Sequence, residues 1–416
     1  MRALQKPELL APASGWIMLR AAVDAGADAV YFGAGRLNMR THARNFMPAE
    51  LKRAVLFCHE RGVRAYLTLN TIVYENEMKQ VDKLLARARD AGVDAVIVWD
   101  MAALSMAKKL KMEIHLSTQA SISNAAAAEF YRRQGVSRVI LARECTLKQI
   151  RAISTKTGIG LEAFIHGAMC VSISGRCFLS QEIFKRSANR GDCIQPCRRS
   201  YRIVDPNEGH DLELGDGYVM SPKDLCALPF LDRLIKAGIT SFKIEGRNRS
   251  PEYVKTVTSV YRRAVDEICT MKSVSRLRPE RIDSYMSELD TVYHRGFSPG
   301  FYLGMPGAED FSDTYGSKAS ARKVYVGLVT NYFRKARAAE LRVEAGCLSV
   351  GDDLLIMGNK TGVIEEKVRS LHVDFNEVEK AVKGQSVGIA TLTPVRKNDK
   401  VYVIKKKRPE KNKGGR

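Results

Sequence analysis

Five segments in the N-terminal part of this chain repeat one pattern, in which a helical stretch ends at a glycine and a short apolar strand follows. The copies span residues 24–33, 61–70, 90–100, 134–143 and 236–245. A glycine at the end of a helix adopts the left-handed backbone that other residues avoid, and a continuous apolar strand is buried on both faces. The repeat therefore predicts parallel strands that are covered by helices on their outer face.

Three further apolar segments, residues 8–12, 113–119 and 160–166, complete a set of eight strands. Helical patterns follow the strands, for example at residues 48–61, 76–91 and 123–134. Eight βα units predict a TIM-like (β/α)8 barrel, with a doubly wound sheet as the alternative. Residues 167–240 separate the seventh strand from the eighth, and such an insertion would lie above the C-terminal mouth, where barrel enzymes build their active sites.

The length of the chain predicts more than one domain, because 416 residues exceed a single core of about 250 to 300 residues. We assign residues 1–272 to the barrel with its Cys-rich insertion (167–240), 273–320 to a helical and irregular connection, 321–404 to a small C-terminal β-barrel and 405–416 to a basic disordered tail. Short strands between glycine-containing turns predict the β-barrel. Its glycine spacing resembles the second-domain barrel of translation factors.

The net charge of +21 creates a field that attracts polyanions, of which nucleic acid is the usual candidate. The chain has no apolar run long enough to span a bilayer, and it begins with the polar sequence Met-Arg-Ala-Leu-Gln-Lys. We therefore expect a soluble, cytoplasmic protein with no membrane partner.

Five of the nine cysteines lie close together in the sequence: Cys170, Cys177, Cys193, Cys197 and Cys226. Cytosolic thiols are kept reduced, so a group of this kind is more typical of metal or cluster ligands than of disulfides. The spacings differ from the short knuckles of zinc ribbons and fingers, whereas an iron-sulfur cluster takes thiolates from several loops. Both kinds of centre remain open from spacing alone.

Polar residues at the ends of the apolar strands are the candidates for chemistry at the mouth. We single out Lys243, Glu245 and Arg247 because strand alternation points all three to one side, where the two cations could hold a dicarboxylate. An internal ion-pair network is the equal alternative. His166 ends the seventh strand and is a candidate acid or base, with a buried structural histidine as its alternative.

Longer motifs resemble those of the collagenase-like peptidase family. They comprise residues 164–170, 175–180, 189–198, 221–225 and 243–247, with further matches at residues 8–13 and 294–300. Studied members of that family resemble hydroxylases of tRNA, ribosomal RNA or quinone precursors that carry a four-iron four-sulfur cluster. The resemblance implies cluster ligands at Cys170, Cys177 and Cys193, with Cys226 preferred to Cys197 as the fourth.

The length and the C-terminal barrel are most similar to members that hydroxylate the wobble uridine of tRNA to 5-hydroxyuridine in a prephenate-dependent reaction. The resemblance therefore implies tRNA and prephenate as partners, and optionally a partner subunit of the same family. Our candidate catalytic residues, chosen from the strand ends, are His166, Lys243, Glu245 and Arg247.

Three other functions stay open. One is hydroxylation of another substrate, such as ribosomal RNA or a quinone precursor. The family name suggests a peptidase, although His59-Glu60 lacks the second histidine of a zinc-protease motif and no Gly-x-Ser-x-Gly elbow is present. A noncatalytic RNA-binding protein with a structural zinc would also suit the basic charge and the C-terminal barrel.

Overall fold

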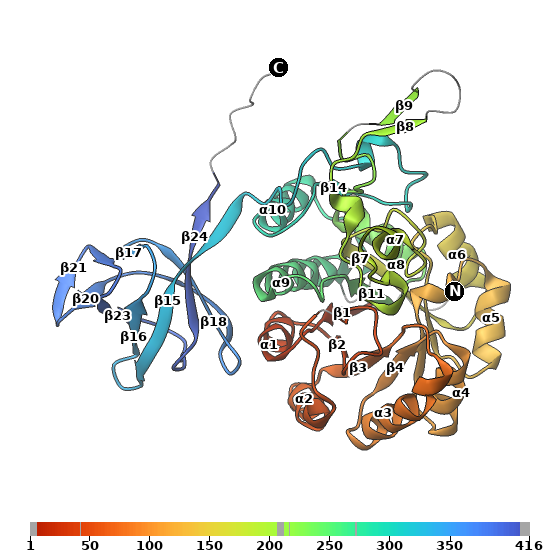
Figure 1. The fold of residues 1–416 in the computed structure, drawn as a ribbon, viewed down its shortest axis with the longest axis horizontal. Coiled ribbons are helices and arrows are strands. Elements are labelled where there is room, and N and C mark those ends of the chain that lie inside the picture. Colours follow the sequence, from red (N-terminus) through yellow and green to blue (C-terminus); the bar gives the residue numbers. More distant parts are fainter. Residues whose placement is uncertain (1–5, 42, 206–211, 216, 271–272, 408–416) are drawn as a thin grey trace.

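The computed structural model describes residues 6–41, 43–205, 212–215, 217–270 and 273–407. Figure 1 shows two bodies, a helix-covered barrel and a smaller domain of strands that lies beside it. None of the helices among these residues is long and apolar enough to cross a membrane.

Eight parallel strands form the barrel, as the repeat predicts. They are β1 (Glu8–Pro12), β2 (Ala29–Gly33), β3 (Arg64–Leu69), β4 (Ala95–Val98), β5 (Ile114–Leu116), β6 (Arg138–Ile140), β7 (Gly160–Gly167) and β11 (Ser241–Ile244). Each strand pairs with the next, and β11 pairs in parallel with both β7 and β1. This closure confirms the TIM-like barrel and excludes the doubly wound sheet.

Helices cover the outer face of the barrel. They are α1 (Trp16–Asp24), α2 (Leu51–His59), α3 (Met78–Asp90), α4 (Met101–Lys109), α5 (Ala125–Arg133), α6 (Leu147–Lys156), α8 (Leu231–Lys236) and α9 (Pro251–Ile268). Their buried faces and the strands form one apolar core, in which Leu9, Phe32 and Leu67 are fully buried. Burial of this kind is the main stabilising contribution to such a domain.

The interval between β7 and β11 holds the predicted insertion. It contains α7 (Leu179–Phe184), the short helices η4 (Ala188–Arg190) and η5 (Pro196–Arg198), the hairpin β8 (Ile203–Asp205) and β9 (Leu212–Gly215), and β10 (Asp224–Cys226). The strand β10 pairs antiparallel with the end of β7, so the insertion returns to the rim of the barrel.

Residues 273–320 belong structurally to the barrel, although we expected a separate connection. Here β13 (Ser273–Val274) pairs with β12 (Cys269–Thr270), α10 (Pro279–Asp290) packs on α9, β14 (Phe297–Ser298) pairs with β10, and η7 (Ala308–Asp310) follows. Tyr285, Leu289 and Tyr302 lie in the barrel core. The segment therefore buttresses the rim because its apolar side chains complete that core.

The C-terminal domain is an antiparallel β-structure around its own core. Its strands are β15 (Ala321–Phe333), β16 (Ala338–Val343), β17 (Cys347–Ser349), β18 (Asp353–Gly358), β19 (Gly362–Lys367), β20 (Leu371–Val373), β21 (Asn376–Val378), β22 (Lys380–Val382), β23 (Ser386–Ala390) and β24 (Lys400–Lys406). Lys405 and Lys406 pair with β15, so the predicted tail at 405–416 starts too early; residues 408–416 lie outside the described residues.

The two bodies touch along α1. Ala21 of α1 packs against Leu355, Met357 and Val363 of β18 and β19. An ion pair between Lys323 Nζ and Glu252 Oε1, at 2.7 Å, adds a polar contact from β15 to α9. The C-terminal domain therefore sits on the side of the barrel, where α1 and α9 lie, and the mouth is formed by other elements (Figure 1).

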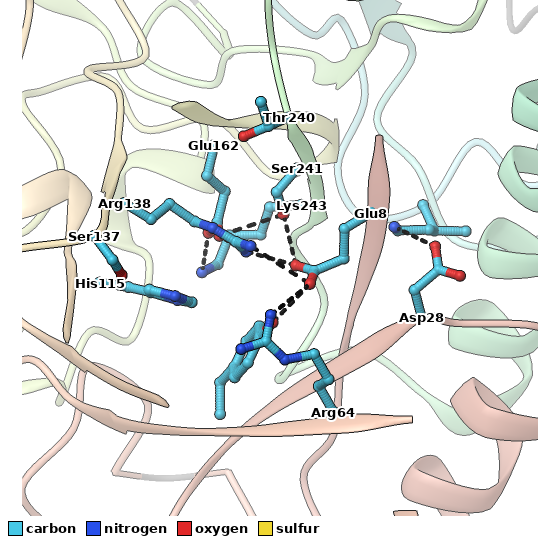
Figure 2. A network of polar contacts seen from close by, with 12 residues as sticks. Glu8, Asp28, Arg64, His115, Ser137, Arg138, Glu162, Thr240, Ser241 and Lys243 are labelled. Atoms are coloured by element: carbon cyan, nitrogen blue, oxygen red, sulfur yellow. Dashed lines mark hydrogen bonds and ion pairs between the residues drawn. The ribbon is translucent and has the colours of Figure 1, made fainter. Parts of the chain in front are cut away.

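A network of polar side chains lies inside the barrel, at the N-terminal ends of its strands (Figure 2). The Glu8 carboxylate accepts from Arg138 at 2.5 Å and from Ser241 at 3.0 Å. The Glu162 carboxylate lies 3.3 Å from Arg138 and accepts from Lys243 Nζ at 2.8 Å. Each buried charge thus has an opposite partner, which is the condition for its burial.

Candidate active site at the barrel mouth

A cavity of about 60 Å³ lies at the C-terminal ends of the barrel strands. Lys243, Glu245 and Arg247 line it together, as predicted, although only Lys243 belongs to β11 and the other two follow its end. Its other polar residues are Tyr31, Arg40, Thr68, Asn70, Ser117, Thr118, Gln119, Arg143, Cys170 and Ser174. The cavity is therefore polar, rich in cations and bordered by the first cysteine of the insertion.

Lys243 belongs to both the cavity and the buried network. Its ammonium donates to Glu162 and lies 4.3 Å from the centre of the Tyr31 ring. Burial lowers the pKa of Lys243, while the charge of Glu162 opposes that shift. Lys243 thus belongs to the internal ion-pair network through Glu162 and also lines the cavity.

Glu245 is the anionic group of the cavity. Its Oε1 accepts from Arg40 Nη2 at 3.0 Å, and its Oε2 lies 3.8 Å from Arg143 Nη2. Burial raises the pKa of Glu245, but Arg40, Arg143 and Arg247 outweigh it and hold the pKa at about 2. Glu245 is therefore ionised at neutral pH and acts as an acceptor rather than as an acid.

Arg247 is a buried cation with neutral partners. Its Nη1 donates to Asn38 Oδ1 at 2.9 Å and to Thr68 Oγ1 at 3.0 Å, and it forms no ion pair with a carboxylate of the described residues. Burial lowers its pKa to about 10, so it remains charged at neutral pH. A cation held in this way at a cavity wall attracts an anionic group or a polarised carbonyl.

His166 lies away from the mouth, in contrast to the prediction of a catalytic role. The pairing of β7 with β11 shifts between Phe164 and His166, so the bulge reverses the alternation and turns His166 outward. Its ring lies between Tyr253, Tyr261 and Phe297, and its Nδ1 is 3.3 Å from Tyr261 Oη. The position favours the structural alternative.

His166 should make the folded protein sensitive to acid. Burial, with added repulsion from Arg249 and His294, lowers its pKa to about 3. Between the unfolded pKa of about 6.5 and this value, only the unfolded chain takes up the proton, so stability falls as pH falls, by about 1.4 kcal/mol per pH unit. We expect the free energy of unfolding in urea, measured at pH 7 and pH 5.5, to fall less in His166→Phe than in the wild type. An equal fall would contradict a neutral, buried His166.

Two glycines dock the cysteine-bearing loops onto the mouth. Gly191, with φ of 83°, lies two residues before Cys193, and a Cβ there would meet Asn38 O at 2.3 Å. Gly175, with φ of 78°, lies two residues before Cys177, and a Cβ there would meet Gln119 Cγ at 2.7 Å. Both positions need the left-handed backbone and a close approach, which only glycine provides at low cost.

Hydrogen bonds join the cysteine-bearing segments to one another. Asn189 Oδ1 accepts from the backbone N–H of Cys177 at 2.8 Å. The buried Arg198, next to Cys197, donates to the carbonyl of Met169 and to that of Pro222. Three separate stretches are thereby held around Cys170.

Four cysteines of the insertion lie near one another. Burial raises the pKa of Cys193 and that of Cys197, and the thiolates of Cys170 and Cys177 raise both further. Charged groups influence each other in this way only when they are near. Cys170, Cys177, Cys193 and Cys197 therefore form a group, which we call the thiol group.

Cys226 lies apart from the thiol group, which argues against the prediction that it is the fourth ligand. It is buried on β10, opposite His166, with its Sγ 3.7 Å from both Tyr261 Oη and Met286 Sδ. Burial raises its pKa to about 11, and the other cysteines do not contribute to that shift. The side chain faces α9 and α10 because β10 forms part of the rim, which sequence spacing does not reveal.

The four thiols of the thiol group are the candidate ligands of a metal centre. No three His, Cys, Asp or Glu side chains in the described part of the chain are arranged to hold one metal ion. A four-iron cluster bonds each thiolate to a different iron and so spaces its ligands more widely. Arg143 Nη1 lies 3.9 Å from Cys170 Sγ, and Arg40 also lies near this thiol, so cations would balance the negative charge of thiolates.

Seven further polar residues stand where the apolar strands of the sequence end, namely Asn70, Asp100, Ser117, Thr118, Gln119, Arg143 and Glu144, and the structure divides them into two sets. Asn70, Ser117, Thr118, Gln119 and Arg143 line the cavity. By contrast, Asp100 caps α4 by accepting from Ala102 N and Ala103 N, and Glu144 is exposed.

Arg40 is the main residue that sequence reasoning missed. It lies in the glycine-containing loop after β2, and that loop is the only sequence feature that could have indicated its role.

A closed (β/α)8 barrel with a cavity lined by ionisable residues at its C-terminal mouth has the architecture of TIM-barrel enzymes. Residues 14–312 match the family described as Peptidase family U32, and residues 337–393 match Elongation factor Tu domain 2. The first match covers most of the chain, so this chain belongs to peptidase family U32.

Relatives across this family carry different functional names. The chain is 40% identical over 412 residues to a protein of Porphyromonas gingivalis named Collagenase, with 96% of this chain and 98% of the relative covered. It is 40% identical over 409 residues to an uncharacterized protease of Methanocaldococcus jannaschii, with the same coverage. It is 35% identical over 385 residues to tRNA hydroxylation protein P1 of Bacillus subtilis, covering 91% of this chain and 90% of that protein.

Proposed function

We propose that this protein hydroxylates the wobble uridine of tRNA to 5-hydroxyuridine, in a prephenate-dependent reaction that uses a four-iron four-sulfur cluster. The observation that carries the proposal is the thiol group beside the mouth, where Cys170 shares one cavity with the buried cation Arg247. The relative named for tRNA hydroxylation and the net charge of +21 support an RNA substrate.

Cys170, Cys177, Cys193 and Cys197 would hold the cluster, and the bound cluster would supply one-electron redox chemistry. Arg247 and Lys243 keep positive charge at the cavity wall, where a polarised carbonyl of the uracil ring would be stabilised. Glu245 positions Arg40 and Arg143 through its ion pairs. A wobble uridine is already unpaired in the anticodon loop, so its presentation to the mouth costs little free energy.

The experiment that tests this proposal is mass spectrometry of nucleosides from tRNA of cells with and without the gene. We expect 5-hydroxyuridine and its derivatives to fall strongly on deletion. Unchanged amounts would contradict the proposal.

A peptidase is the second candidate, because two relatives are named Collagenase and protease. The mouth cavity holds no serine beside a histidine, since its lining contains no histidine at all among the described residues. Cleavage of gelatin by the purified protein, unaffected by loss of Cys170, would favour this candidate.

A further inference from the structure

A second and larger cavity lies next to the mouth. It has a volume of about 370 Å³ and is lined by Arg40, Cys193, Gln195, Asn248, Arg249 and Arg295, among others. We call it the arginine pocket. It shares Arg40 and Glu245 with the mouth cavity, so the ion pair between these two residues forms a common wall.

The charges around the arginine pocket are not balanced. Arg249 Nη2 and Arg295 Nη1 share a single buried carboxylate, that of Asp224, at 2.7 Å and 3.2 Å. On the common wall, Glu245 forms ion pairs with both Arg40 and Arg143. Arg40, Arg249 and Arg295 line the pocket, and their ion pairs supply two carboxylates, those of Glu245 and Asp224, so about one positive charge remains, which favours an anionic ligand.

The polar groups of the pocket are suited to binding the oxygen atoms of a carboxylate. Arg295 is only 5% exposed and donates its Nη2 to Gln195 Oε1 at 3.1 Å, which leaves a neutral partner on that side. Ser250 at the start of α9 also lines the pocket, and its side chain caps no N–H of that helix. The N-terminus of an 18-residue helix therefore adds partial positive charge to the arginines.

Size separates the two cavities. A buried water needs about 10 to 15 Å³ by this measure, so the mouth cavity of about 60 Å³ holds only a few waters. A ring with two carboxylate arms does not fit there. The arginine pocket, at about 370 Å³, lies within the range of ligand sites, about 300 to 1,000 Å³.

We propose that the arginine pocket, and not the mouth cavity, binds the dicarboxylate co-substrate. This inference rests on the proposed function for the identity of the ligand, and it replaces the expectation that Lys243 and Arg247 hold the two carboxylates. The ligand then lies against the common wall, beside Cys193 of the thiol group, and leaves the mouth cavity open to a carbonyl of the uracil ring.

The test is calorimetric titration of the full-length, cluster-loaded protein with prephenate. In Gln195→Glu, a carboxylate of the same size replaces the neutral partner of Arg295 and cancels one positive charge. In Asn248→Asp, an exposed pocket residue gains a negative charge. We expect each variant to bind prephenate about tenfold or more weakly. The matched control Gln181→Glu makes the same charge change on exposed α7, outside both cavities, and should bind within about twofold of wild type.

A second titration, with an anticodon stem-loop RNA, separates the dicarboxylate from an RNA phosphate. We expect the pocket variants to bind this RNA nearly as well as wild type does. Weaker RNA binding with unchanged prephenate binding would overturn the inference, as would loss of prephenate binding in Arg247→Gln alone. The iron content of Gln195→Glu is measured because Gln195 lies near Cys193. If this variant has lost iron, prephenate binding by Asn248→Asp decides the test. If wild-type protein binds no prephenate, the proposed function fails as well.

Discussion

Replacement of Cys197 by serine should remove the iron-sulfur cluster, whereas replacement of Cys226 by alanine should leave it in place. The reason is position, because Cys197 belongs to the thiol group and Cys226 is buried against Tyr261 and Met286. Wild-type protein, purified without oxygen, should carry about four irons and four labile sulfides per chain and absorb visible light. In Cys197→Ser, all three quantities should fall to a small fraction of these values.

Cys226→Ala should retain the iron and lose only folding stability, by about 1 to 2 kcal/mol, because it opens a small cavity beside α9. Cys145→Ala is the matched control, since Cys145 is also a buried thiol but lies outside the insertion. Loss of iron in Cys226→Ala together with retention in Cys197→Ser would restore Cys226 as the ligand. A colourless wild-type protein with about one zinc per chain would instead favour the noncatalytic RNA-binding alternative.

Replacement of Arg247 by glutamine should abolish most hydroxylation without loss of folding. Arg247 is a buried cation whose hydrogen bonds go to Asn38 and Thr68, and no carboxylate of the described residues pairs with it. The buried charge of Arg247 therefore lowers the stability of the folded protein, and it is free to interact with a substrate. We expect the rate to fall about 100-fold or more, as it does when an electrostatic stabiliser of a transition state is removed.

The same substitution should leave the free energy of unfolding unchanged or raise it by about 1 to 2 kcal/mol, because a desolvated and unpaired charge is lost. Arg36→Gln is the matched control, since it removes an equal charge from an exposed position in the loop after β2. Iron content should match wild type in both variants. If Arg247→Gln is instead destabilised and fully active per folded molecule, Arg247 is a structural residue.

The barrel and its insertion were predictable because five βα units carry the same local pattern, a glycine at the helix end followed by an apolar strand. Lys243, Glu245 and Arg247 were predictable as mouth residues because polar side chains at the end of an apolar barrel strand lie at the mouth. The C-terminal domain followed from its glycine-punctuated strands. These features depend on neighbours in the sequence.

The features that the sequence did not predict concern contacts between distant segments. His166 was expected at the mouth, but a bulge opposite β11 turns it toward α9, and no local pattern marks that bulge. Cys226 was preferred to Cys197, but its strand β10 pairs with β7 and faces the aromatic residues of α9. Arg40 was missed because its role arises only when the loop after β2 meets Glu245.

The amount of 5-hydroxyuridine and its derivatives in tRNA tests the central claim most directly. The measurement uses cells that lack this gene and carry a plasmid with the wild-type chain, Cys170→Ala or no insert, with equal protein amounts verified. We predict that the wild-type chain restores these nucleosides and that Cys170→Ala resembles the empty plasmid. Full amounts of the nucleosides in cells with the empty plasmid, or full restoration by Cys170→Ala, would contradict the account.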